Sequence, residues 1–146
     1  MPGGTPLVLI VNHHPEVVLL LEQVVNDLGF ESALLANDSD WQTDGYSALL
    51  AYINKRLPRA VLFDLPPPYE EAARTVLRLL RESDLDERQW IVLSTSPSSL
   101  ELIEQASDAS VLAKPFDLDE LTELLERAVN PERAALDGNA SSAAAG

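Results

Sequence analysis

The sequence predicts an α/β protein in which one parallel β-sheet is covered by helices on both faces. Short apolar runs alternate with longer amphipathic stretches along the chain, and this alternation is typical of parallel sheets. The run at 60–63 is uninterrupted, which suits a strand covered on both faces. Asp64 ends this strand, and the prolines at 66–68 prevent its continuation. The length of 146 residues and the hydrophobic content of 46% fit one domain with a substantial core.

We expect this domain to occupy residues 7–129, after a disordered N-terminus at 1–6. The segment 130–146 becomes rich in Ala, Ser and Gly, which is typical of a flexible tail or linker. The expected strands are 7–11, 32–36, 60–64, 90–93 and 110–113, and the expected helices that follow them are 15–28, 46–56, 69–83, 100–106 and 118–128.

Breakers and capping patterns predict where the helices begin and end. Pro15 suits the first position of a helix, where its missing N–H would have had no partner, and Gly29 suits the stop. Ser98 and Glu101 have capping-box spacing, which predicts that Ser98 caps a fourth helix over 100–106. Asp117 begins the last helix with the same spacing to an acid.

Composition excludes several classes of function. The formal net charge of −14 and the pI near 4.3 argue against nucleic-acid binding, because such a surface repels phosphate backbones. Without cysteine, the chain has neither a disulfide nor a thiolate metal site. Its apolar runs are far shorter than a membrane span, and its N-terminus lacks the pattern of a signal peptide. We therefore expect a soluble, cytoplasmic protein that does not contact membranes.

Polar residues follow three of the predicted strands. Asp64 ends the third strand, Ser94 follows the fourth, and Lys114-Pro115 follow the fifth. Ligands of parallel sheets bind where the carboxyl ends of the strands meet. Taken alone, Asp64 would equally suit the start of a turn, Ser94 a turn hydroxyl, and Lys114 an exposed loop. In this order and at these strand ends, the three motifs resemble the receiver domain of bacterial response regulators.

The resemblance implies a flavodoxin-like (CheY-like) fold, with a five-stranded parallel sheet of order 2-1-3-4-5 and five flanking helices. It also implies a phosphorelay, in which a sensor histidine kinase or a phosphotransfer protein passes a phosphoryl group to Asp64. By its matched position, Lys114 would contact one phosphoryl oxygen, and the Ser94 hydroxyl would hydrogen-bond another. We expect such a domain to signal by contact and not to act as an enzyme.

The match is incomplete after the first strand. Receivers usually carry two adjacent acids there, which hold Mg²⁺ together with the phospho-acceptor, whereas the matching residues here are Asn12 and His13. Mg²⁺ prefers hard oxygen ligands in near-octahedral geometry, and an imidazole suits zinc, nickel or iron. Asn12, His13 and Asp64 thus form a degenerate site, for which we expect weak Mg²⁺ binding at most. Lys114 can neutralise Asp64 without any ion.

Two further departures concern the switch that responds to phosphorylation. Val111 stands where the family usually has Tyr or Phe, whose ring changes rotamer upon phosphorylation. Valine is small and stiff at χ1, so it cannot respond to phosphorylation in this way. Pro66 and Pro67 stiffen the loop after Asp64. Both departures indicate a receiver with a weakened or altered switch.

A histidine pair beside this site suggests an alternative, a metal site formed by His13, His14 and Glu16. Adjacent residues of one loop seldom chelate one ion well. We therefore favour a polar loop in which His13 bonds to Asp64 or to the backbone.

Acidic residues concentrate on the last two predicted helices. Most such runs are solvated faces, and acids in a first turn also suit the helix dipole. Receivers usually contact partners through these helices, so the resemblance implies that an acidic version binds a basic protein partner or a second copy. The acids are Glu101, Glu104, Asp117, Asp119, Glu120, Glu123 and Glu126.

Our leading hypothesis is a stand-alone receiver that accepts a phosphoryl group on Asp64 and signals by protein contacts. The alternative is a pseudo-receiver, an adaptor that works without phosphorylation. A small metal- or ligand-binding protein or enzyme of the same fold is a third hypothesis, which only the histidine pair supports.

Two geometric predictions follow from the leading hypothesis. Asn12–His14, Asp64, Ser94 and Lys114 should converge at one edge of the sheet. The Lys114 ammonium should lie within about 10 Å of the Asp64 carboxylate, one Debye length at moderate salt. The Lys114–Pro115 peptide bond should be cis, as it typically is in the family that the sequence resembles.

Overall fold

The computed structural model describes residues 5–12, 14–36 and 46–130. His13, residues 37–45 and the part of the expected tail from residue 131 lie outside these ranges.

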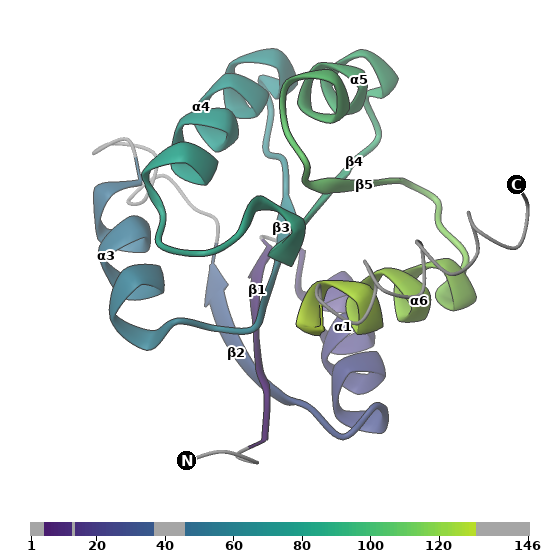
Figure 1. Cartoon of the computed structure of the whole chain (residues 1–146). Helices are drawn as coiled ribbons and strands as arrows, with labels where there is room; N and C mark the ends of the chain where they lie inside the picture. Colours follow the sequence, from purple (N-terminus) through teal and green to yellow (C-terminus); the bar gives the residue numbers. More distant parts are fainter. Residues whose placement is uncertain (1–4, 13, 37–45, 131–146) are drawn as a thin grey trace, which may run out of the picture.

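The described chain forms one five-stranded sheet in the order β2-β1-β3-β4-β5, and every pair of neighbouring strands is parallel (Figure 1). This order confirms the predicted flavodoxin-like fold. The strands are β1 (Leu7–Asn12), β2 (Glu31–Ala36), β3 (Ala60–Asp64), β4 (Trp90–Ser94) and β5 (Ser110–Ala113).

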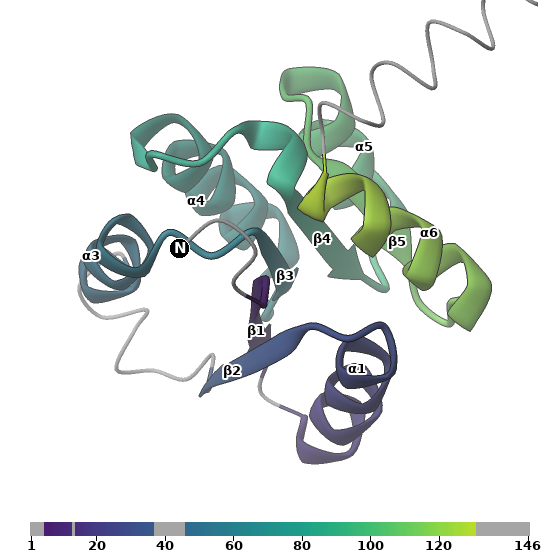
Figure 2. The same ribbon diagram turned by 60° about the horizontal axis from the view of Figure 1, so that its bottom comes forward.

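Five α-helices flank the sheet in the described ranges. Helices α1 and α6 lie side by side on one face, and α3, α4 and α5 cover the other (Figures 1 and 2). None of the helices in residues 5–12, 14–36 and 46–130 is long and apolar enough to cross a membrane. The helices are α1 (Pro15–Asp27), α3 (Ser47–Arg56), α4 (Tyr69–Glu82), α5 (Pro97–Ala106) and α6 (Leu118–Val129), with a short 3-10 helix η1 (Glu87–Gln89) before β4.

The sheet divides the core into two layers, because successive side chains of a strand point to opposite faces. On β1, Ile10 packs in the layer under α1 and α6, whereas Val11 packs in the layer under α3, α4 and α5. On β3, Leu62 and Phe63 divide in the same way. The alternation continues to the strand ends, where the polar residues stand.

Most predicted helix ends are confirmed, but the start of α5 differs. Pro15 occupies the first turn of α1, and the Asp117 side chain caps α6 by accepting the Asp119 N–H at 2.9 Å. α5 begins at Pro97 and is capped by Ser96, so the predicted cap at Ser98 is wrong by two residues and the expected range 100–106 begins three residues late. Pro97 suits the first helical position better than any later one, because it has no N–H to donate.

The connection between α4 and β4 contains the short helix η1, which the sequence did not predict. Asp86 caps this helix with a reciprocal pair of hydrogen bonds. Its carboxylate accepts the Arg88 N–H at 2.8 Å, and its own N–H donates to the Gln89 Oε1 at 2.9 Å. The Arg88 guanidinium also hydrogen-bonds to the Asp86 carboxylate and lowers the pKa of that group.

Leu57 caps the C-terminus of α3; it has a left-handed backbone (φ 47°, ψ 60°) and is 52% exposed. A non-glycine residue in this region costs about 1–2 kcal/mol, and this exposed side chain offsets little of it. We therefore expect Leu57→Gly to raise the free energy of unfolding by about 1 kcal/mol in urea denaturation. Leu57→Ala keeps the Cβ and should not stabilise the protein; equal stabilisation by both variants would contradict this explanation.

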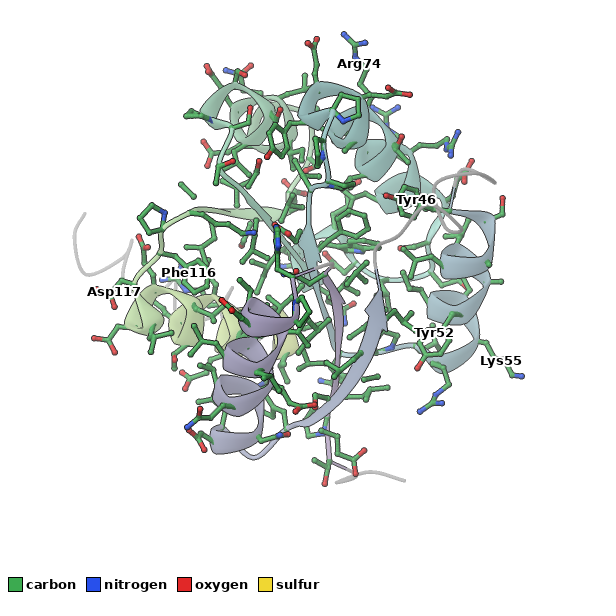
Figure 3. The ribbon with its side chains drawn as sticks, turned by 180° about the vertical axis from the view of Figure 1, so that it is seen from behind. Tyr46, Tyr52, Lys55, Arg74, Phe116 and Asp117 are labelled. Atoms are coloured by element: carbon green, nitrogen blue, oxygen red, sulfur yellow. The ribbon has the colours of Figure 1, made fainter. Side chains whose placement is uncertain are left out.

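Charge is distributed unevenly over the two layers. Figure 3 shows Tyr52 and Lys55 of α3 on the opposite side of the molecule from Phe116 and Asp117, which precede α6. The charged residues of α3 are basic, whereas those of α1 are all acidic. The charged residues of these two helices are Lys55 and Arg56 on α3, and Glu16, Glu22 and Asp27 on α1.

Candidate functional site

The central feature of the candidate site is an ion pair at the carboxyl edge of the sheet. Asp64 is the last residue of β3 and is 2% exposed. Its Oδ1 lies 2.5 Å from the Nζ of Lys114, whose side chain is 17% exposed. The predicted approach of these two groups is therefore confirmed. A buried carboxylate needs such a partner, because removing an unpaired charge from water is costly.

The backbone around β5 delivers Lys114 to Asp64. The N–H of Lys114 donates to the carbonyl oxygen of Ser94 at 3.0 Å, so β4 and β5 stay paired up to this point. The Lys114–Pro115 peptide bond is cis, as predicted. The Pro67–Pro68 bond is also cis, an isomer that the sequence did not predict.

Ser94 lies at the same edge, at the end of β4, and is 1% exposed. It stands one residue beyond Leu93, the register partner of Asp64. The Ser94 Oγ accepts the N–H of Ser96 at 3.0 Å. This bond uses the hydroxyl as an acceptor, so its own hydrogen remains available to donate.

Asn12 ends β1 on the other side of Asp64. Val11 pairs with Phe63 in the register of β1 and β3, so Asn12 and Asp64 are the next neighbours along the two strands. The Asn12 side chain is buried, and its Oδ1 accepts the N–H of His14 at 2.7 Å. This local turn precedes Pro15 and leads the chain into α1.

The described donors do not fit Mg²⁺. The Asp64 carboxylate is already paired with Lys114. The amide oxygen of Asn12, the other candidate ligand, is engaged by the His14 backbone. Mg²⁺ wants several unencumbered oxygens in octahedral geometry. No group of three or more His, Cys, Asp or Glu side chains suited to a metal exists among the described residues.

The other predicted site residues are placed as follows. His14 and Glu16 are exposed at the start of α1, and His13 lies outside the described residues, so the expected contacts of His13 stay a prediction. Val111 is partly buried and packs against the layer under α3, α4 and α5. Pro66 is buried directly after Asp64. The described residues thus bring together a buried carboxylate, an ammonium and neutral polar groups.

Comparison with known sequences gives no match: no protein-family model and no curated protein matches this chain.

Comparison with solved structures gives receiver domains. A chain from Chloroflexus aurantiacus J-10-fl, named as a response regulator, is 26% identical with a TM-score of 0.65, and the match covers 86% of this chain and 98% of that one. The receiver domain of a sensor histidine kinase from Pseudomonas aeruginosa PAO1 is 24% identical with a TM-score of 0.61, over 86% and 98% of the two chains. That structure has a magnesium ion coordinated in its active site cleft.

A CheY-like receiver domain from Methanospirillum hungatei JF-1 is 18% identical, with a TM-score of 0.67 over 90% of this chain and 99% of that one. The protein therefore has the fold of response regulator receiver domains, and the resemblance drawn from its sequence is confirmed.

Proposed function

We propose that this protein is a receiver domain that accepts a phosphoryl group on Asp64 and signals through protein–protein contacts, with a weakened dependence on Mg²⁺. The observation that supports it most is the ion pair between Asp64 and Lys114 at the carboxyl edge of the sheet. Phosphoryl transfer needs little more than a positioned nucleophile and charge neutralisation, and this pair supplies both.

Each residue has a separate role in the proposed reaction. A carboxylate oxygen of Asp64 attacks phosphorus and forms an acyl phosphate. The Lys114 ammonium, which neutralises the carboxylate before transfer, neutralises a phosphoryl oxygen afterwards. The Ser94 hydroxyl donates to another phosphoryl oxygen. The module is not a turnover enzyme in this scheme, because its product stays attached to the chain.

The proposed donor is a sensor histidine kinase or a phosphotransfer protein, and the proposed compartment is the cytoplasm. The output is a contact through the acidic face of α5 and α6, where a basic protein or a second copy would dock. The acids expected to form this face are all exposed; they are Glu101, Glu104, Asp117, Asp119, Glu120, Glu123 and Glu126.

A second candidate function is a pseudo-receiver that serves as an adaptor without phosphorylation. The ion pair also favours this candidate, because Asp64 is neutralised by the chain itself and needs no ion or phosphoryl group to complete the site. Labelling of Asp64 separates the two candidates.

We expect slow, stoichiometric labelling of the protein by phosphoramidate, detected as the added mass of one phosphoryl group on the intact chain. Asp64→Asn should remove it, because an amide is a poor nucleophile toward phosphorus. Asp84→Asn is the matched control, since Asp84 is an exposed aspartate in the connection before β4, and it should label like the wild type. Labelling that persists in Asp64→Asn, or its absence from the wild type, would favour the adaptor.

A further inference from the structure

The amide nitrogen of Asn12 is a buried donor that lacks an acceptor. Asn12 is 3% exposed, and its Nδ2 has no hydrogen-bond partner within the part of the chain that the structure describes. The orientation of the amide is fixed, because its Oδ1 must face the His14 N–H that it accepts at 2.7 Å. Buried donors without partners are rare in folded proteins, so this one calls for an explanation.

The register places this donor beside the phospho-acceptor. Asn12 and Asp64 follow the paired residues Val11 and Phe63 on two strands that are about 4.8 Å apart. Ile10 and Leu62 both face the layer under α1 and α6. Asn12 and Asp64 each lie two residues further along the same strands, so they face the same side of the sheet.

We infer that Asn12 donates a hydrogen bond from Nδ2 to an oxygen of a phosphoryl group held at Asp64. The site would then take this group with the Lys114 ammonium and the Asn12 amide as donors, and without a divalent ion. The inference rests on the proposed function and specifies how the site binds its phosphoryl group. An amide suits this role because it donates to an oxyanion, whereas the acid usual at this position in receivers would repel one.

The metal-free reaction balances with phosphoramidate as the phosphodonor. A carboxylate oxygen of Asp64 forms a bond to phosphorus as the phosphorus–nitrogen bond breaks. The bonding pair leaves with nitrogen, which carries its three hydrogens away as ammonia. The negative charge of the carboxylate and the single net charge of the zwitterionic donor become the two charges of the acyl phosphate. No further reactant is needed.

Asn12→Asp is a sharp test, because it replaces the Nδ2 donor of the side chain by an acceptor oxygen and keeps the size and shape of the side chain. One carboxylate oxygen can still accept the His14 N–H, so the turn before α1 is retained. The other oxygen replaces the Nδ2 donor. Asn12→Ala removes the donor without adding charge. Asn54→Asp adds the same charge on α3, where the Asn54 Oδ1 accepts the Asp84 N–H, and serves as the matched control.

The experiment measures the rate of Asp64 labelling by phosphoramidate in EDTA and in Mg²⁺ for these four proteins, with a thermal melt to confirm folding. We expect the wild-type rates in the two solutions to agree within about twofold. Asn12→Ala should be about tenfold slower in both, the ordinary effect of losing a hydrogen bond to a charged group. Asn12→Asp should be as slow in EDTA and gain rate from Mg²⁺, whereas Asn54→Asp should match the wild type.

Each other outcome has a definite meaning. Wild-type labelling that requires Mg²⁺, or a folded Asn12→Ala that labels at the wild-type rate in EDTA, would overturn the donor role of Asn12 and leave phosphoryl transfer to Asp64 intact. Absence of labelling at Asp64 in all four proteins and both solutions would overturn the proposed function and the inference together.

Discussion

The double variant Asn12→Asp/His13→Asp should label at Asp64 at least about tenfold faster in Mg²⁺ than the wild type does, since each 1.4 kcal/mol of recovered transition-state stabilisation accelerates transfer tenfold. The two substitutions restore the pair of acids that receivers usually carry after the first strand. Together with Asp64, these two acids would offer Mg²⁺ hard oxygen ligands of the kind that the described residues do not provide as a group. Intact-mass spectrometry over time measures the rates.

Two controls make this prediction specific. The added mass should disappear when Asp64→Asn is combined with the double variant, and EDTA should remove the gain in rate. Fast, Mg²⁺-dependent labelling of the wild type would show that the missing acids do not limit phosphoryl transfer. Failure of the double variant to label faster would instead implicate the stiff segment Pro66–Pro68 as the barrier to transfer.

Lys114→Met should lower the free energy of unfolding by about 3 kcal/mol, because it leaves the buried Asp64 carboxylate without its cation. This value is at the low end for a broken buried ion pair, since the Lys114 side chain is 17% exposed and water can reach the site. Urea denaturation followed by circular dichroism measures the loss.

The contrast with an exposed ion pair checks the cause. Arg127 and Glu123 on α6 are 2.7 Å apart, with side chains 60% and 62% exposed, so Arg127→Met should cost less than about 0.5 kcal/mol. Combining Asp64→Asn with Lys114→Met removes both charges and should recover most of the lost stability. A double variant as unstable as Lys114→Met alone would mean that the lysine acts through packing and not through its charge.

The sheet could be predicted from the sequence because its evidence is repeated along the chain. The three central strands are buried apolar runs, and each of the five strands is followed by a helix, so five local patterns agree on one topology. The start of α5 was harder to predict, because three of the four residues from Ser96 to Ser99 are serines and any of them could cap a helix. Only the position of Pro97 in the first turn decides among them.

The candidate site was predictable as a set of positions but not as a set of bonds. The ends of the strands place Asp64 and Lys114 at one edge of the sheet, and their opposite charges favour an ion pair there. The hydrogen bonding of Asn12 could not be predicted in this way, because the sequence does not reveal whether the backbone bonds to the oxygen or to the nitrogen of its side-chain amide. That depends on the turn at His14, which three-dimensional structure alone defines.

Among the described residues, the opposite charges of α1 and α3 add a charge asymmetry to a polyanion. In the field of a positively charged partner, such a body experiences a torque and rotates before the two surfaces touch. The side that carries α1 and α6 would therefore lead the approach, and the end of α3, with Lys55 and Arg56, would trail. Salt shortens the reach of this alignment to about 8 Å at physiological ionic strength, so the encounter rate, more than the lifetime of the complex, would fall as salt is added.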